Sequence, residues 1–439
     1  MILDAVLALG LLLSTATELR FPGVPIGPGE ILLVFWLALM LVREIFRRGP
    51  PLTPALSQLL IFWLLFAVAL SVGTLAGYVI GDKHDPDLFL HDILAYPLLV
   101  AVSCLSVVEP CARDRLHRVA WLLAGFGSAS LALLVAVAWE LIAITAIDPW
   151  YWDRFRGWSA NPMQLAFLCA VLALLALYLA DAATRTSERI AALACAILPI
   201  YVGRLTKSDS VTVMLVTATP IFLALKLWGW LFAFGPKLTL RPALAWIVVL
   251  ALPLLLISGI PLRTLIAGQV EQMAKGVSKE NGESSKEAEL RFQVWSAGIS
   301  RGMESGMLGL GPGPHLEIPD VLVAARRLEI LPKYVETPQI NGTANFEAHN
   351  TPVDLFTQGG LIAVLSFIWI LTTAFFNTYK ARLAGLTTFL CGVTVFGFAN
   401  LIIRQPLFWF TIALCLVSSA ATNGTRSRLG IRFPRHSEA

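Results

Sequence analysis

Residues 162–181 read PMQLAFLCAVLALLALYLAD, an apolar run of 20 residues whose one charged member, Asp181, stands at its end. At 1.5 Å per residue a helix of this length crosses the hydrocarbon core of a bilayer, which is about 30 Å thick. No water is available there to bond free backbone groups, so the segment must satisfy them internally as a helix. This run is the clearest member of a series that recurs along the whole chain.

The composition extends this pattern to the whole protein. Of the 439 residues, 57% are hydrophobic and only 14% are charged, against about 25% charged in soluble domains. The expected spans cover 2–18, 29–46, 56–80, 88–108, 118–146, 162–181, 189–203, 209–229, 242–260, 353–378, 383–402 and 405–421. The first run lacks a basic flank and a small-residue cleavage site, so we count it as a span and not as a signal peptide. The sequence predicts an all-α, polytopic membrane protein with about 12 transmembrane helices and a large, partly helical loop.

The distribution of basic residues predicts the orientation. Alternate loops carry the clusters at 43–48, 113–118, 185–189, 226–241 and 380–382, and the C-terminal tail adds four arginines. The positive-inside rule then places both termini in the cytoplasm. We expect one membrane domain in the inner membrane, in which 1–260 holds spans 1–9, 261–352 is a large periplasmic loop, and 353–439 holds spans 10–12 and the tail.

Ionisable residues collect at the outer ends of the spans, whereas the span centres are almost free of charge. This arrangement favours chemistry at the outer surface over a path through the bilayer. None of the six cysteines lies in the long outer loop, and no Cys or His pair has metal-ligand spacing. We therefore expect no disulfide there, no metal and no cofactor.

Several helices that enter from the outside begin with capping signals. Asn161-Pro-Met-Gln164, Thr206-Lys-Ser-Asp209 and Thr351-Pro-Val-Asp354 each resemble a capping box. Such helix N-termini attract anions, phosphate in particular. Basic side chains stand beside them, namely Arg154, Arg156, Arg204, Lys207 and Arg404. Ordinary caps and interfacial residues explain each one singly, but as a set this positive charge runs against the orientation rule.

The second half of the outer loop carries two further features. Residues 290–303 place Phe292, Trp295, Ile299 and Met303 at three- and four-residue spacing, which predicts an amphipathic helix on the membrane surface. The turn Gly309-Leu-Gly-Pro-Gly-Pro-His315 ends this helix and lacks a Walker lysine, so we interpret it as structural.

His349 and Asn350 stand immediately before the tenth span. A lone histidine is more often structural than catalytic. Its place at an outward-facing helix start, beside an asparagine, favours a functional role.

These motifs, in this order, resemble the O-antigen ligase/polymerase superfamily of bacterial envelope enzymes. Arg291-Phe-Gln-Val-Trp295 is similar to its R-x-x-x-W helix, Gly309–Gly313 to its G-x-G-x-G turn, and His349-Asn350 with Gly359-Gly360 to its H-N…G-x-x-G signature. Gly157–Pro162 and Arg204–Ser208 resemble two further sequence motifs of the superfamily, so the likeness covers about 150–375. Two positions depart from the pattern: Asp209 replaces an arginine, which leaves open whether Arg204 or Lys207 contacts phosphate, and Ala363 replaces a glycine.

The resemblance implies a metal-independent glycosyltransferase in the bacterial inner membrane, active at the periplasmic face in lipopolysaccharide or exopolysaccharide biosynthesis. Its donor would be a glycan on undecaprenyl pyrophosphate, and its acceptor a glycan or lipid A-core. His349 would be the catalytic base, with Arg291 and Arg204 holding the pyrophosphate. The substrate-binding residues would be Lys207, Arg154, Arg156, Asn161, Asn350, His315 and Arg404.

The lipid bilayer and a chain-length regulator are further expected partners, and nucleic acid is not. We favour a polymerase slightly over a ligase. A transporter or flippase of lipid-linked sugars is the alternative, and it would place charges in a central cavity open to both sides. A structural scaffold would not require outward positive charge beside a histidine.

Overall fold

The computed structural model describes residues 1–21, 26–45, 52–82, 86–108, 111–143, 148–151, 153–233, 282–317 and 346–428. These residues are mostly helical, as predicted. The first helices are α1 (Ile2–Leu13), a 3-10 turn (Thr17–Leu19), α2 (Pro28–Ile45), α3 (Pro54–Ile80), α4 (Pro86–Val107) and α5 (Ala112–Ala138). A two-stranded antiparallel hairpin follows, with β1 at Trp150–Tyr151 and β2 at Arg154–Phe155. The later helices are α6 (Pro162–Ala182), α7 (Thr186–Leu205), α8 (Asp209–Ala233), α11 (Gly282–Glu304), α13 (Thr351–Lys380), α14 (Ala384–Gly397) and α15 (Pro406–Arg428).

Every expected span within the described residues overlaps a helix, although α5 and α14 end before the expected positions 146 and 402, and the expected span 242–260 lies outside the described residues. In the part of the chain that the structure describes, six helices contain stretches long and apolar enough to cross a membrane, namely α3, α4, α5, α6, α8 and α13. The chain is therefore a multi-pass membrane protein, while the number of about 12 spans and the orientation stay predictions. Helix α1 ends earlier than expected, because the hydroxyls of Ser14 and Thr15 donate to the carbonyls of Leu11 and Leu12 and close its last turn.

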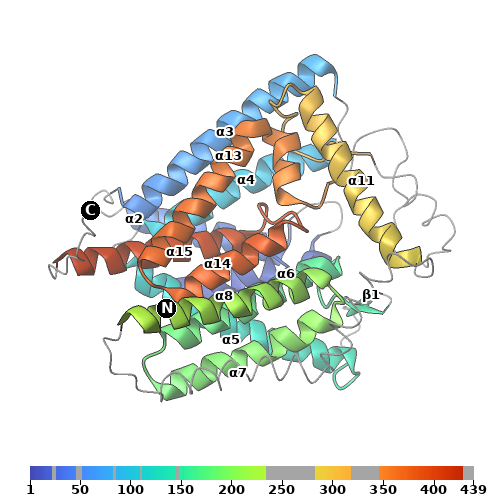
Figure 1. Ribbon diagram of the computed structural model, residues 1–439. Coiled ribbons are helices and arrows are strands. Elements are labelled where there is room, and N and C mark those ends of the chain that lie inside the picture. The colour runs from blue at the N-terminus through green and yellow to red at the C-terminus, as the bar shows by residue number, and fades with distance from the viewer. Residues whose placement is uncertain are drawn as a thin grey trace. The chain divides into compact units, whose positions relative to one another are not determined.

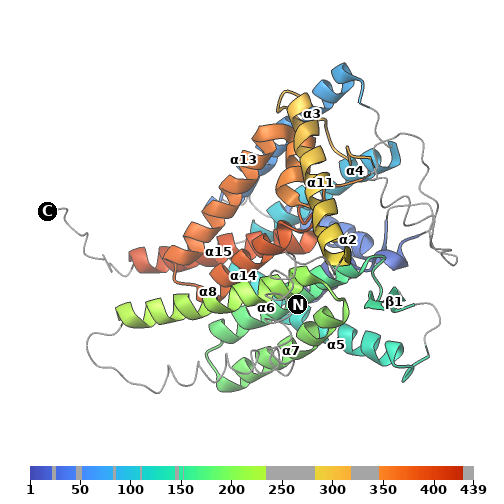
Figure 2. The same ribbon diagram turned by 45° about the vertical axis from the view of Figure 1, so that its right-hand side comes forward.

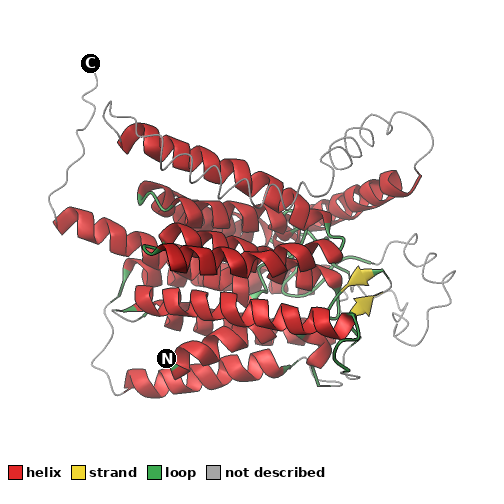
Figure 3. Ribbon diagram, turned by 90° about the horizontal axis from the view of Figure 1, so that it is seen from below, coloured by secondary structure: helices red, strands yellow, loops and turns green. Residues whose placement is uncertain are grey.

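The chain forms two compact units, residues 1–222 with 298–439, and residues 223–297. In the first unit α6 packs against α5, α7 and α14, and 16 of its 21 residues are buried. A helix that is apolar on every side needs neighbours on every side, which explains its central place. Seen from below, the helices lie side by side and the β1–β2 hairpin stands at one end of them (Figure 3).

Helix α13 is broken at Gly360, and its ribbon bends sharply there beside α3 (Figures 1 and 2). Gly360 has φ 62° and ψ −157°, a combination open essentially to glycine alone. The segment after α11 replaces the lost helical bonds: Leu361 N donates to Met307 O at 2.9 Å, and Leu310 N donates to Thr357 O at 2.8 Å. Irregular backbone at membrane depth is tolerated where protein satisfies it in this way.

The glycine turn after α11 is structural, as its sequence predicts. Gly309, Gly311 and Gly313 all have positive φ. The turn packs against α3 where that helix carries glycine: a Cβ on Gly73 would lie 2.8 Å from Gly311 N, and one on Gly77 would lie 2.6 Å from Leu310 O. The amphipathic helix predicted over 290–303 is also present, as the last part of the longer α11.

Candidate functional site

The starts of α6, α8 and α13 are linked at one end of the first unit. Ser208, just before α8, contacts Met163 at the start of α6 (Oγ–Sδ 3.4 Å). The side-chain amide of Asn400, before α15, donates to Ser210 in α8 at 3.1 Å. The backbone carbonyl of Asn400 accepts a hydrogen bond from the Thr351 hydroxyl of α13 at 2.6 Å. The motifs before α6, α8 and α13, which are far apart in the chain, therefore lie at one end of the bundle.

His349 stands at this end in a strained backbone conformation. It has φ 52° and is exposed, and its ring packs edge-on against Phe346 with centroids 5.3 Å apart. The residues on both sides are held by the buried carboxylate of Asp354, which accepts Ala348 N at 2.7 Å and Asn350 N at 3.0 Å. A left-handed, non-glycine residue costs about 1–2 kcal/mol and persists only where its surroundings impose it. Such imposed strain is typical of functional positions.

The helix start after His349 is capped differently from the sequence prediction. Asn350, and not Thr351, is the N-cap of α13: its side-chain oxygen accepts Val353 N at 3.3 Å. Its amide group donates to Phe398 O at 2.8 Å, and the side chain is buried. The predicted box at Thr351 is wrong by one residue, because the Thr351 hydroxyl bonds Asn400 instead. The described contacts of Asn350 position α13, and its contact with a sugar stays a prediction.

Of the other two predicted boxes, one keeps only its N-cap, because the Gln164 side chain accepts the Thr17 hydroxyl at 2.5 Å, and the other is wrong. Asn161 caps α6, with its side-chain oxygen accepting Met163 N at 2.8 Å. Thr206 instead belongs to the end of α7, where its hydroxyl donates to Gly203 O at 2.7 Å. The short interval between α7 and α8 leaves Thr206 in the last turn of the earlier helix.

Two of the predicted basic residues are exposed and lie on elements that pack against each other. Arg204 lies in the last turn of α7 and Arg154 in β2, and these two elements pack together. Among the residues that the structure describes, neither arginine forms an ion pair, although the charge of Arg154 helps to lower the pKa of the neighbouring Asp153 carboxyl. Lys207, which has φ 51°, forms an ion pair with Asp153, and its hydrogen bond holds the pKa of the Asp153 carboxyl below its usual value. Arg204 and Arg154 are thus the cations most available to an anion here.

Two other predicted basic residues are engaged in internal pairs. Arg156 is buried and pairs with Glu18 at 3.4 Å and Asp148 at 3.8 Å, which ties the hairpin to the segment after α1. Arg404 pairs with Asp92 of α4 at 2.5 Å and with Glu347. These contacts give both arginines a role in holding segments together, and their contact with substrate stays a prediction.

His315 lies in a second polar cluster that the sequence did not reveal. Its buried ring contacts Asp82 Oδ2 (Nδ1, 2.8 Å) and Gly311 O (Nε2, 2.8 Å), and Asp82 also pairs with Arg301. Burial would raise the pKa of the Asp82 carboxyl, but the hydrogen bonds and charges of His315 and Arg301 outweigh it and lower that pKa. The fold encloses His315 in this cluster, so a role in substrate binding stays only a prediction.

Asp92 carried a signal that sequence analysis could have used. It lies inside the expected span 88–108, and an acidic residue within an apolar run must find a partner or a function. Asp82, which directly follows the left-handed Gly81 cap of α3, carried no comparable signal.

Arg291 lies in α11, within the compact unit formed by residues 223–297. In the same helix Phe292 and Trp295 form an edge-on pair with centroids 5.6 Å apart. The predicted convergence of Arg291 with Arg204 stays a prediction, because the two residues belong to different units.

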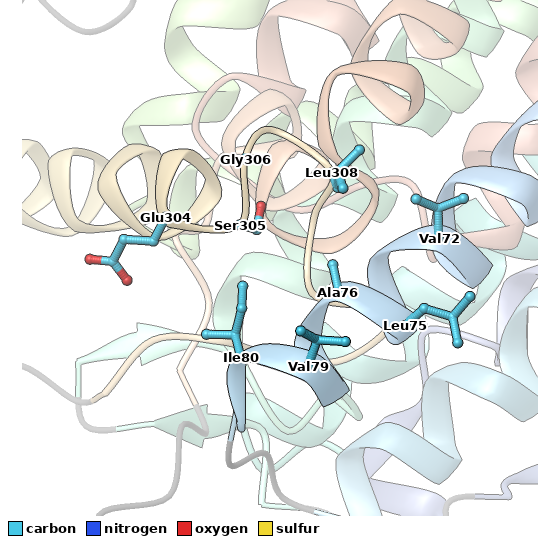
Figure 4. Close-up of a pocket in the computed structure, with 9 residues that line it drawn as sticks. All are labelled: Val72, Leu75, Ala76, Val79, Ile80, Glu304, Ser305, Gly306 and Leu308. Carbon is cyan, nitrogen blue, oxygen red and sulfur yellow. The ribbon is translucent and has the colours of Figure 1, made fainter.

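An apolar groove of about 450 Å³ runs between α3 and the segment after α11 (Figure 4). Glu304 and Ser305 are the polar residues of its lining. Glu304 pairs with Arg301, and the Ser305 hydroxyl donates to Gly302 O and accepts Gly309 N. With these groups already bonded, the groove offers little to recognise a sugar, and we do not place the reaction there.

Fold and site together define a multi-pass membrane protein with a histidine and exposed arginines gathered at one end of its helices. A family model described as O-antigen ligase matches residues 191–368, from α7 to α13. This range includes Arg204, Arg291, the glycine turn and His349. No curated protein matches the chain. The match confirms the predicted resemblance to the O-antigen ligase/polymerase superfamily over residues 191–368.

Proposed function

We propose that this protein transfers a glycan from undecaprenyl pyrophosphate to a sugar hydroxyl at the periplasmic face of the inner membrane. The observation that carries the proposal is the exposed, left-handed His349, held from both sides at the same end of the bundle as Arg204 and Arg154. The superfamily match supports the same reaction type.

In the proposed step, the acceptor hydroxyl oxygen attacks the anomeric carbon of the donor sugar. The imidazole of His349 takes the hydroxyl proton, and histidine is the side chain used most often as such a general base. The bond between the anomeric carbon and the phosphate oxygen breaks, and the undecaprenyl pyrophosphate leaves with the electron pair.

The leaving group gains negative charge, and a guanidinium can stabilise it with two parallel, charge-assisted hydrogen bonds. Arg204 is exposed beside the proposed reaction end, and we assign it this role together with Arg291. Arg154 and Lys207 would bind the outer phosphate or the first sugar. No metal is part of this scheme.

His349→Asn tests the proposal. Asparagine adopts the left-handed region readily, so this variant should keep the fold. His349→Ala would instead leave a strained residue at this position. We expect transfer to fall about 10²–10⁴-fold, with normal expression, thermal stability and binding of undecaprenyl pyrophosphate. His117→Ala, a change to another histidine in α5, should leave transfer unchanged. Near-native turnover by His349→Asn would refute the assignment.

The acceptor distinguishes a polymerase from a ligase. We favour the polymerase, which would extend a second lipid-linked glycan. Incubating the purified protein with donor alone, or with donor and lipid A-core, separates the two: a ladder of lengthened lipid-linked products without lipid A-core supports the polymerase, and transfer only in the presence of lipid A-core supports the ligase.

A further inference from the structure

Four segments meet around the buried carboxylate of Asp92. Its Oδ1 accepts Nη1 of Arg404, from the segment before α15, at 2.5 Å. Its Oδ2 accepts Gly313 N, from the turn after α11, at 3.1 Å. The other Nη of Arg404 pairs with Glu347, from the segment before α13. The guanidinium therefore bridges a carboxylate in α4 to a carboxylate two residues before His349.

The burial of this bridge sets its strength. The side chain of Asp92 is 0% exposed, and those of Arg404 and Glu347 are 16% and 20% exposed. A buried carboxylate without a partner is costly, so Asp92 holds Arg404 firmly. Arginine suits the bridging position because its planar fork reaches two carboxylates at once, which a lysine cannot do with the same geometry.

The bridge acts on the segment that carries His349. Phe346 exchanges two backbone hydrogen bonds with Leu316, at 2.9 and 3.2 Å, and Ala348 N is bonded to Asp354. Glu347, between them, is held by Arg404. Residues 346–348 are thus anchored one after another, and the exposed left-handed residue comes next. The conformation of His349 depends on these anchors, since the backbone would otherwise relax to negative φ.

We propose that Arg404 is a positioning residue, which holds Glu347 on the buried anchor Asp92 and thereby fixes the imidazole of His349 toward the acceptor. This inference rests on the proposed function of His349. It differs from the phosphate contact that the sequence predicts for Arg404, because a guanidinium bridging two carboxylates has its charge already balanced.

Glu347→Gln separates these two roles, because it keeps the size of the side chain and removes its charge. We expect kcat for release of undecaprenyl pyrophosphate from lipid-linked oligosaccharide, isolated from the host membrane, to fall about 10-fold or more, since small misplacements of a catalytic group are costly. The donor KM and the Kd for undecaprenyl pyrophosphate should not change. If Arg404 instead binds phosphate, freeing it from Glu347 should lower KM and Kd while kcat is kept, and that result would overturn the proposal, as would no change in either.

A second set of variants changes Arg404 itself. Arg404→Gln should lower kcat at least as much as Glu347→Gln, and the double variant should be no worse than Arg404→Gln alone, because the residues act as one unit. Arg404→Lys should restore part of the loss. Arg118→Gln, which breaks an ion pair of 2.8 Å with Asp4, is the matched control and should leave kcat unchanged. Fully additive losses would contradict the bridge.

The two proposals fail in different ways. Absence of transfer by the wild-type protein under all acceptor conditions would refute the proposed function. Wild-type transfer together with native kcat and KM in Glu347→Gln would refute the positioning role alone. Equal melting temperatures of the variants and the wild type show that a fall in kcat does not come from unfolding.

Discussion

Gly360→Ala should be among the most destabilising single substitutions in the first unit. The residue has φ 62° and ψ −157°, and placing a side chain in this region costs about 1–3 kcal/mol. An added Cβ would lie 2.1 Å from Met307 O and 2.5 Å from Leu308 C, which are backbone atoms that cannot rotate away. The segment after α11 would have to move.

That movement would break or weaken the backbone hydrogen bonds that join this segment to the break in α13. They are Leu361 N to Met307 O at 2.9 Å, Leu310 N to Thr357 O at 2.8 Å, and Gly311 N to Gln358 O at 2.8 Å. Each contributes about 1 kcal/mol net. Together with the strain, the loss in the free energy of unfolding should be about 4–6 kcal/mol.

Denaturation in detergent micelles by increasing SDS, followed by tryptophan fluorescence, measures this loss. Two glycines provide matched controls. Gly306 has φ 67° but open space around its Cβ position, so Gly306→Ala should cost only the strain, about 1–2 kcal/mol. Gly125 lies in α5, also with open space around its Cβ position, so Gly125→Ala should raise the free energy of unfolding by about 1 kcal/mol. If Gly360→Ala lost no more than Gly306→Ala, the packing argument would be refuted.

The remaining predictions concern orientation, phosphate binding and pH. Ser284→Cys, in a cysteine-free background, should react with an impermeant reagent on intact spheroplasts, and labelling only after lysis would reverse the predicted topology. Arg204→Ala and Arg291→Ala should each weaken binding of undecaprenyl pyrophosphate by about 1.5–3 kcal/mol, and Arg291→Lys should also be impaired because it lacks the fork; native product length and amount from both alanine variants would contradict this. Because the pKa of Asp82 is lowered from 3.8 in the fold, its ion pairs stabilise the protein above that value and lose effect as pH falls through the folded-state pKa. Asp82→Asn should therefore be less stable at neutral pH and lose less stability on acidification, whereas an unchanged acid profile would show that the cluster does not titrate as proposed.

Much of the fold follows from local properties of the chain. Apolar runs such as 162–181 predict their helices because the requirement to satisfy backbone groups in hydrocarbon acts on each segment by itself. The glycines of 309–313 likewise predict a turn, since positive φ is a local property of the residue. The amphipathic spacing of Phe292 and Trp295 was sufficient to place the last part of α11, and the position of His349 immediately before the expected span 353–378 is also evident from the sequence alone.

The tertiary structure decided what those letters could not, because ion pairs and close approaches join residues hundreds of positions apart. Asp92 and Arg404 are separated by 312 residues, and Asp82 and His315 by 233, so no spacing rule connects them. The cap of α13 fell to Asn350 because Phe398 and Asn400 offered partners to Asn350 and Thr351 from another helix end. Gly360 breaks α13 only because the segment after α11 packs there and bonds the open backbone. Local sequence therefore determined which segments are helices, while packing between distant segments decided where they bend, how they are capped and which charges are left to meet a ligand.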